Sequence, residues 1–223
     1  MHRTFRWITL AISMAAAFPA AAQDAEVPEP VRQLVEKFND DEIPFNDKPV
    51  ILGNENAPVT GVFVFGLSEN TSWMVNRAFS SIKKHIKSGQ LKLVVIEMPL
   101  TWHDMQAFAG FRCVAPEKHW AVLEDAVSNP RYAGRMKNDS LMNAPDHIWS
   151  MMRGNGVERE KAERCMRNTA IVGHIEAQRR VVKDTWGTEI APSFIIGDKL
   201  ITDPTSDSAI IAAIESALKG NAQ

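Results

Sequence analysis

The chain has no long apolar run beyond its N-terminus and no excess of charge of either sign. A membrane-spanning helix needs roughly 20 consecutive apolar residues, and no later segment supplies them. The 25 basic and 27 acidic residues give a net charge of −2, and they form neither a basic patch nor a block of like charge. These absences argue against membrane insertion, against nucleic acid as a partner and against a charged interaction tail.

Residues in arrangements that hold metals or cofactors are scarce as well. The six histidines show no His-x-x-x-His or His-x-His spacing, so His103, Asp104 and His119 make a weak metal site. Trp102 and Trp120 fit the core or its rim better than a cofactor site. We therefore expect neither a metal nor a cofactor.

The N-terminus has the pattern of a cleaved export signal. Arg3 and Arg6 precede an apolar stretch from Trp7 to Phe18, and small residues follow up to Ala22. The alternative, a membrane anchor, is disfavoured because the apolar stretch is too short to span a bilayer. We expect residues 1–22 to be removed near Ala22 and the protein to be periplasmic or secreted, with a remainder that fits one domain.

The chain contains only two cysteines, Cys113 and Cys165, which lie 52 residues apart. In an exported protein an even number of cysteines favours a disulfide. The alternative is a pair of buried free thiols.

The segment after the signal predicts a separate amphipathic helix. Val31, Leu34, Val35 and Phe38 follow the i, i+3, i+4, i+7 spacing of a helix with one apolar face. We assign residues 23–47 to this helix and a linker.

A strand–helix–strand unit follows. Val59 to Phe65 is rich in β-branched and aromatic residues and predicts a buried strand, and Leu91 to Met98 predicts a second. Between them, one face of a single predicted helix carries the apolar residues Val75, Ala78, Phe79, Ile82 and Ile86, and Gly89 ends it. A crossover of this length predicts that the two strands are parallel.

The rest of the chain is mostly helical until sheet signals return near its end. Helices are predicted at 105–112, 120–127, 141–152 and, as one long helix, 158–182. Two strands at 192–196 and 199–201 flank a Gly197-Asp198 hairpin turn, and a last helix covers 210–218. This order suits a thioredoxin-like α/β fold with a helical insertion, although periodicity alone does not separate it from other α/β topologies.

Short local sequences carry a family resemblance. These are Ile51-Leu52-Gly53-Asn54 followed by Ala57-Pro58-Val59-Thr60, then Met98-Pro99-Leu100, and finally Ala191-Pro192-Ser193-Phe194 followed by Gly197. In this order and spacing they resemble DsbA-like thioredoxin-fold proteins, which are exported thiol–disulfide oxidoreductases with an inserted helical subdomain. The resemblance covers residues 48–218 and places the insertion at about 102–182.

The resemblance also shows what is missing. The family's Cys-x-x-Cys pair begins the helix after the first core strand, where the helix N-terminus favours a thiolate. An ungapped comparison puts Glu69 and Ser72 at these positions, and a one-residue slip puts Ser68 and Thr71 there. No register supplies a cysteine, and a serine cannot form a disulfide. The alternative of a hydrolytic Ser72 or a carboxylate acid–base site lacks a neighbouring His or Asp.

Two further roles follow from the resemblance. Ala191, Pro192 and Ser193 correspond to the family's cis-proline loop, which pairs with extended substrate segments; the alternative is a turn that only the fold needs. Cys113 and Cys165 resemble the positions of a structural disulfide found in some relatives, which for this loop length is worth about 4 kcal/mol. The rival reading, a redox-active pair, lacks short spacing and a helix-start position.

We therefore expect a redox-inactive, chaperone-like module, not an enzyme, that binds exported proteins or extended peptide segments. One alternative is a thiol–disulfide oxidoreductase that acts through Cys113 and Cys165 or a partner's thiols. Another is a structural subunit of an envelope complex, with a homodimer formed through the N-terminal helix around Val31 to Phe38.

Overall fold

The computed structural model describes residues 43–67, 69–77, 79–129, 144–203 and 207–220. The predicted export signal at 1–22 and the predicted helix around Val31 to Phe38 lie outside these residues. Among the helices in the described ranges, none has the length and apolar character needed to cross a bilayer.

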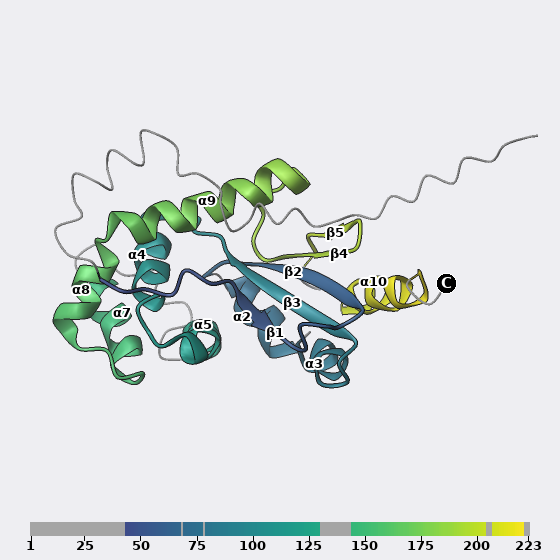
Figure 1. Ribbon diagram of the computed structural model, residues 1–223, viewed down its shortest axis with the longest axis horizontal. Coiled ribbons are helices and arrows are strands. Elements are labelled where there is room, and N and C mark those ends of the chain that lie inside the picture. The colour runs from purple at the N-terminus through teal and green to yellow at the C-terminus, as the bar shows by residue number, and fades with distance from the viewer. Residues whose placement is uncertain (1–42, 68, 78, 130–143, 204–206, 221–223) are drawn as a thin grey trace, which may run out of the picture.

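A five-stranded mixed sheet forms the centre of the molecule, with the strand order β1-β3-β2-β4-β5 (Figure 1). The strands are β1 (Val50–Leu52), β2 (Val59–Phe65), β3 (Leu91–Glu97), β4 (Ser193–Ile196) and β5 (Lys199–Ile201). β2 and β3 are parallel, as the crossover predicts, and the other neighbouring pairs are antiparallel. Gly197, with φ of 62°, makes the predicted tight turn between β4 and β5.

The crossover between β2 and β3 differs from the single helix that its apolar face predicts. It contains α2 (Glu69–Arg77) and α3 (Phe79–Lys87), on either side of residue 78, which is not among the described residues. Gly89 ends α3 as predicted: its φ is 74°, and the Gln90 N–H donates to the His85 carbonyl.

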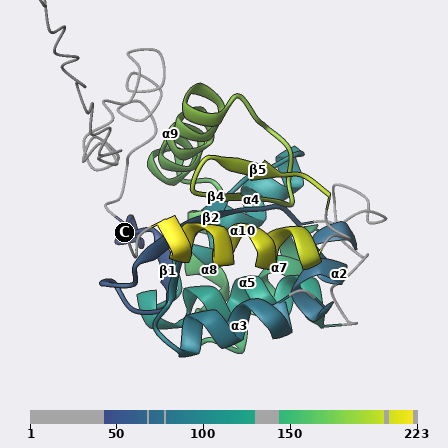
Figure 2. The same ribbon diagram turned by 90° about the vertical axis from the view of Figure 1, so that its right-hand side faces the viewer.

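The two faces of the sheet are covered by different helices. α2, α3 and the C-terminal α10 (Asp207–Gly220) lie on one side, and α9 (Thr169–Trp186) lies on the other (Figures 1 and 2). Successive side chains of β2 point to opposite faces of the sheet, so each face packs against different helices. Phe63 and Phe65 belong to the larger core beneath α2 and α3, whereas Val62 and Val64 pack in a smaller cluster with Val182 of α9.

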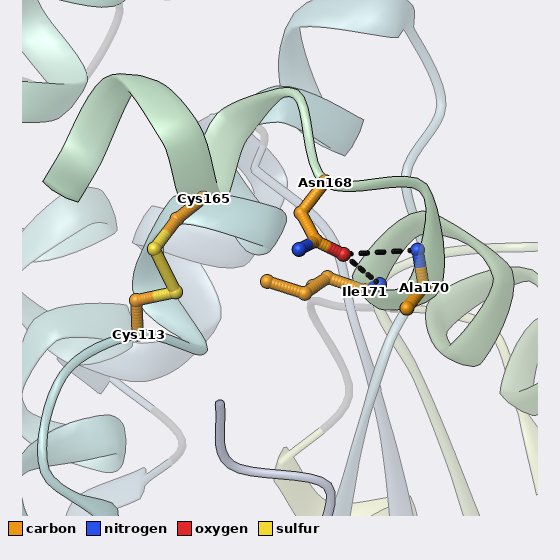
Figure 3. Close-up of a disulfide and its surroundings, with 5 residues drawn as sticks. All are labelled: Cys113, Cys165, Asn168, Ala170 and Ile171. Atoms are coloured by element: carbon orange, nitrogen blue, oxygen red, sulfur yellow. Dashed lines mark hydrogen bonds between the residues drawn. A yellow bond between two sulfur atoms is a disulfide. The ribbon is translucent and has the colours of Figure 1, made fainter. Parts of the chain in front are cut away.

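The inserted region between β3 and β4 contains helices and no strand in its described part. It contains α4 (Trp102–Phe111), a short 3₁₀ turn (Pro116–Lys118), α5 (His119–Ser128), α7 (Ala144–Arg153), α8 (Arg159–Met166) and α9. The single helix predicted over 158–182 is wrong, because α8 ends at Met166 and a separate helix, α9, begins at Thr169. Asn168 then caps α9, its side-chain oxygen accepting from the N–H groups of Ala170 and Ile171 at 2.9 and 3.1 Å (Figure 3).

Cys113 and Cys165 form a disulfide, as the even cysteine count predicts. The bond joins the chain just after α4 to α8, and both residues are buried in the larger core (Figure 3). It therefore fastens two helices of the insertion to each other.

Candidate functional site

Three chain segments meet at one edge of the sheet. β2 and β3 are parallel, so both end at this edge, and β4 runs antiparallel to β2, so it begins there. The segment entering α2, the segment entering α4 and the loop before β4 therefore lie beside one another. This is the edge at which open α/β sheets usually place their sites.

Gly66 marks the meeting point. A Cβ added there would lie 2.9 Å from the Cβ of Ala191 and 3.6 Å from the Met98 carbonyl oxygen. The first distance is shorter than real side chains allow, so only glycine permits this approach of the loop before β4 to the end of β2.

The predicted positions of the lost cysteine pair lie at the start of α2. Glu69 is the first residue of the helix, Thr71 is fully buried, and Ser72 is half-buried within the first turn. Ser68 lies outside the described residues. The helix start is therefore present at the sheet edge, and no thiol occupies it.

The predicted loop approaches the segment that leads into this helix, because Ala191 lies against Gly66. The Ala191–Pro192 peptide bond is cis. Ala191 is half-buried, whereas Pro192 and Ser193 are buried, and the Ser193 hydroxyl has no hydrogen-bond partner among the described residues. The binding role of these three residues stays a prediction.

The same edge carries large apolar side chains that remain in water. Leu100 is 54% exposed, Trp102 58% and Ile190 53%. Leu100 and Trp102 follow β3, and Ile190 precedes the Ala191–Pro192 loop. We call these three residues the edge patch. The sequence places Trp102 in the core or at its rim but gives no role to Leu100 or Ile190. The one available signal is that both are apolar residues in loops, outside any periodic face.

A capping box fixes the segment that carries Leu100 and Trp102. The Asp104 carboxylate accepts hydrogen bonds from the backbone N–H groups of Leu100 and Thr101, both at 3.0 Å, and the Thr101 hydroxyl accepts from the Asp104 N–H. Burial raises the pKa of Asp104, although these hydrogen bonds oppose the shift. Asp104 is therefore part of a helix cap, not a free acid.

Sequence reasoning missed a buried ionic cluster beside this edge. Glu97, at the end of β3, binds the Arg112 Nε at 2.6 Å and the His119 Nε2 at 2.9 Å, and all three side chains are almost fully buried. Burial alone would raise the pKa of Glu97, but Arg112 and His119 hold it below its ordinary value. Glu97 was missed because a lone Glu at a strand end gives no sign of its distant partners.

The three residues that the sequence weighs as a weak metal site, His103, Asp104 and His119, have different surroundings in the structure. The described ranges contain no group of three or more His, Cys, Asp or Glu side chains placed to hold a metal. Asp104 is engaged in the helix cap and His119 in the ionic cluster, while the buried Nε2 of His103 has no hydrogen-bond partner among the described residues.

Comparison with known proteins agrees with this architecture. A family model described as thioredoxin matches residues 46–216. No curated protein matches the sequence closely enough to count as a relative.

Solved structures give matches at low sequence identity. Oxidised BdbD from Bacillus subtilis superposes with a TM-score of 0.63 at 16% identity, covering 80% of this chain and all of its own. A thioredoxin-like oxidoreductase from Silicibacter pomeroyi gives 0.58 at 21% identity, covering 77% and 92%. DsbA from Chlamydia trachomatis gives 0.59 at 17% identity, covering 76% and 89%. At these identities the superpositions establish the fold. The family match over most of its length shows that the chain belongs to the thioredoxin family, and its fold, with a helical insertion, is similar to that of these DsbA-like structures.

Proposed function

We propose that this protein is a redox-inactive, peptide-binding member of its family, which holds extended segments of exported proteins at the sheet edge. We further propose that it acts in the periplasm or outside the cell after removal of the signal near Ala22. Homodimerisation through the predicted N-terminal helix stays a prediction.

The observation that carries the proposal is the edge patch. Three large apolar side chains, Leu100, Trp102 and Ile190, are each more than half exposed at one edge of the sheet. Burying one such side chain is worth about 1.5–3 kcal/mol, so an extended polypeptide with apolar side chains would gain by covering them. Grouped exposed apolar residues mark binding surfaces more often than scattered ones do.

The cysteine arrangement supports a role without redox turnover. Thiol–disulfide exchange needs an accessible sulfur, since a thiolate must attack it. The described start of α2 carries no cysteine, and the two cysteines of the chain are bonded and buried in the insertion. The rival function, thiol–disulfide exchange, is supported by the family match and by the similar oxidoreductase structures. In this chain it would have to use Cys113 and Cys165 or the thiols of a partner.

Binding is tested with a labelled, reduced and carboxymethylated α-lactalbumin, which is unfolded and has no thiol to exchange. Fluorescence anisotropy should show saturable binding to the protein. Trp102→Lys and Ile190→Lys should each raise Kd at least tenfold, because each places a charge in the patch. The matched control is Ile51→Lys, which changes an exposed apolar residue on the edge strand β1 and should leave Kd within about twofold of the original.

The outcomes separate the two functions. Absence of saturable binding, or an equal loss in Ile51→Lys, would overturn the binding proposal, provided that thermal melts show all variants folded. Reduction of insulin above the uncatalysed rate, abolished by replacing Cys113 and Cys165 with alanine, would establish the rival function.

A further inference from the structure

The segment from Ile43 to Pro49 forms no helix or strand, yet it is tied to the buried ionic cluster. The Asn46 N–H donates to the Arg112 carbonyl at 2.7 Å, and the Arg112 Nη1 donates back to the Asn46 carbonyl at 2.7 Å. The same nitrogen reaches the Lys48 carbonyl at 3.4 Å. Arg112 therefore holds this segment by both its backbone and its side chain.

Arg112 depends in turn on partners from two other elements. Its Nε donates to Glu97 of β3, and its Nη2 donates to the Gln178 Oε1 of α9 at 3.1 Å. A fully buried guanidinium requires such partners, because an unpaired buried charge is strongly destabilising. Loss of one of them weakens the others.

The hydrogen bonds around His174 fix where its proton lies. Because the Gln178 Oε1 accepts from Arg112, the amide nitrogen of Gln178 must face the His174 Nε2, 3.0 Å away, and donate to it. The His174 Nε2 is therefore bare, and the ring carries its proton on Nδ1. The His174 ring also packs edge-on against Phe45, with ring centroids 5.9 Å apart, so it contacts the segment directly.

His119 is held in a matching way. The Asn46 Oδ1 accepts from the Lys48 N–H at 3.1 Å, so the Asn46 amide nitrogen donates to the His119 Nδ1, also at 3.1 Å. The His119 Nε2 then carries the proton that it donates to Glu97. Two imidazoles thus flank the same arginine. Each accepts a hydrogen bond from a side-chain amide, and a second hydrogen bond fixes the orientation of that amide.

We infer that this cluster is an acid-sensitive clasp, which holds residues 43–49 at neutral pH and releases them in acid while the sheet stays folded. A proton added to the His174 Nε2 makes this atom a donor that faces the donating amide of Gln178. The two donors repel each other, and the hydrogen bond between Gln178 and Arg112 is broken. If Gln178 turns its amide to accept from the protonated ring, its nitrogen then faces the Arg112 donor. Either way Arg112 loses a partner. Acid therefore loosens the segment from the side of α9.

The surroundings of His174 set the pH at which this happens. The charged and titratable groups that act on it are Arg112 and His119 from the insertion, Glu97 from β3 and Asp47 from the segment itself. Burial and the Arg112 charge outweigh the two carboxylates and lower the pKa of His174 to about 4. Since this pKa lies below the unfolded value of about 6.5, the stability held by neutral His174 is complete above pH 6.5 and is lost as the pH falls towards 4.

Hydrogen exchange measured by mass spectrometry tests the clasp on the full chain, with rates corrected for intrinsic pH dependence. A peptide covering residues 43–50 should lose at least tenfold protection at pH 4 relative to pH 7, while a peptide covering Val62 to Phe65 keeps its protection. His174→Gln places a non-titrating acceptor near Nε2 and should keep the segment protected at pH 4. The control His85→Gln changes a partly exposed histidine on α3 and should behave like the original protein.

Equal protection of residues 43–50 at the two pH values would overturn the inference, and so would simultaneous loss in β2 or acid release in His174→Gln. If His174→Gln does not fold, nitrogen–proton correlation spectra of the unmodified protein decide the point. They should show the His174 proton on Nδ1 at pH 7, and a proton on Nε2 would contradict the clasp.

Discussion

A single guanidinium, that of Arg112, joins parts of the chain that are far apart in sequence. It donates to Glu97, to the carbonyls of Asn46 and Lys48, and to Gln178. The charge can be buried only because these neighbours pair with it, since an isolated buried ion would be very costly. The sequence shows only an arginine at the end of a predicted helix, so this role could not be predicted from its spacing.

Glu97→Gln tests how strongly the cluster depends on its one carboxylate. The substitution keeps the size of the side chain but leaves Arg112 without its counter-charge in the core, so we expect a loss of about 3 kcal/mol in the free energy of unfolding. Urea denaturation at pH 7 measures it. The matched control is Glu163→Gln, which breaks an exposed ion pair with Arg159 and should cost less than about 0.5 kcal/mol. Similar losses of unfolding free energy in both variants would mean that the buried cluster contributes no more to stability than an exposed ion pair does.

At the scale of elements, local sequence predicts types better than boundaries. β2 and β3 were predictable almost to the residue, because each is a short, mostly apolar run between turn signals. The break between α8 and α9 was not, because the apolar spacing continues through it and Asn168 gives a weak signal inside a helical run. A cap is decided by which backbone N–H groups the side chain meets.

Asn168→Ala tests this cap. Removing the side-chain oxygen leaves the N–H groups of Ala170 and Ile171 without their acceptor, so we expect the protein to lose about 1 kcal/mol of stability. Asn168→Asp retains an acceptor at a helix N-terminus and should stay close to the original. Thermal melts of the three proteins measure the difference. Equal stability of the Ala and Asp variants would show that the cap does not hold α9.

At the scale of the whole molecule, the fold and the absence of the thiol pair follow from the sequence, whereas the surface of the candidate site does not. The motifs that carry the family resemblance, the last of which contains Pro192, lie in the order that a thioredoxin-like fold requires. No cysteine occurs near Glu69. The edge patch arises only because parallel and antiparallel strands bring Leu100, Trp102 and Ile190 to one edge. The pairing of distant strands brings these residues to the same edge, and the apolar pattern of a single helix or strand does not predict it.

Site-resolved photo-cross-linking tests the central claim most directly. Reduced, carboxymethylated α-lactalbumin carrying a benzophenone group would be bound to the protein, irradiated, and the attachment points mapped by mass spectrometry. The account predicts cross-links within residues 98–104 and 188–193, which flank the start of α2, and fewer of them in Trp102→Lys. Cross-links confined to α7 and α8, or spread evenly over the surface, would contradict a peptide-binding site at this edge of the sheet.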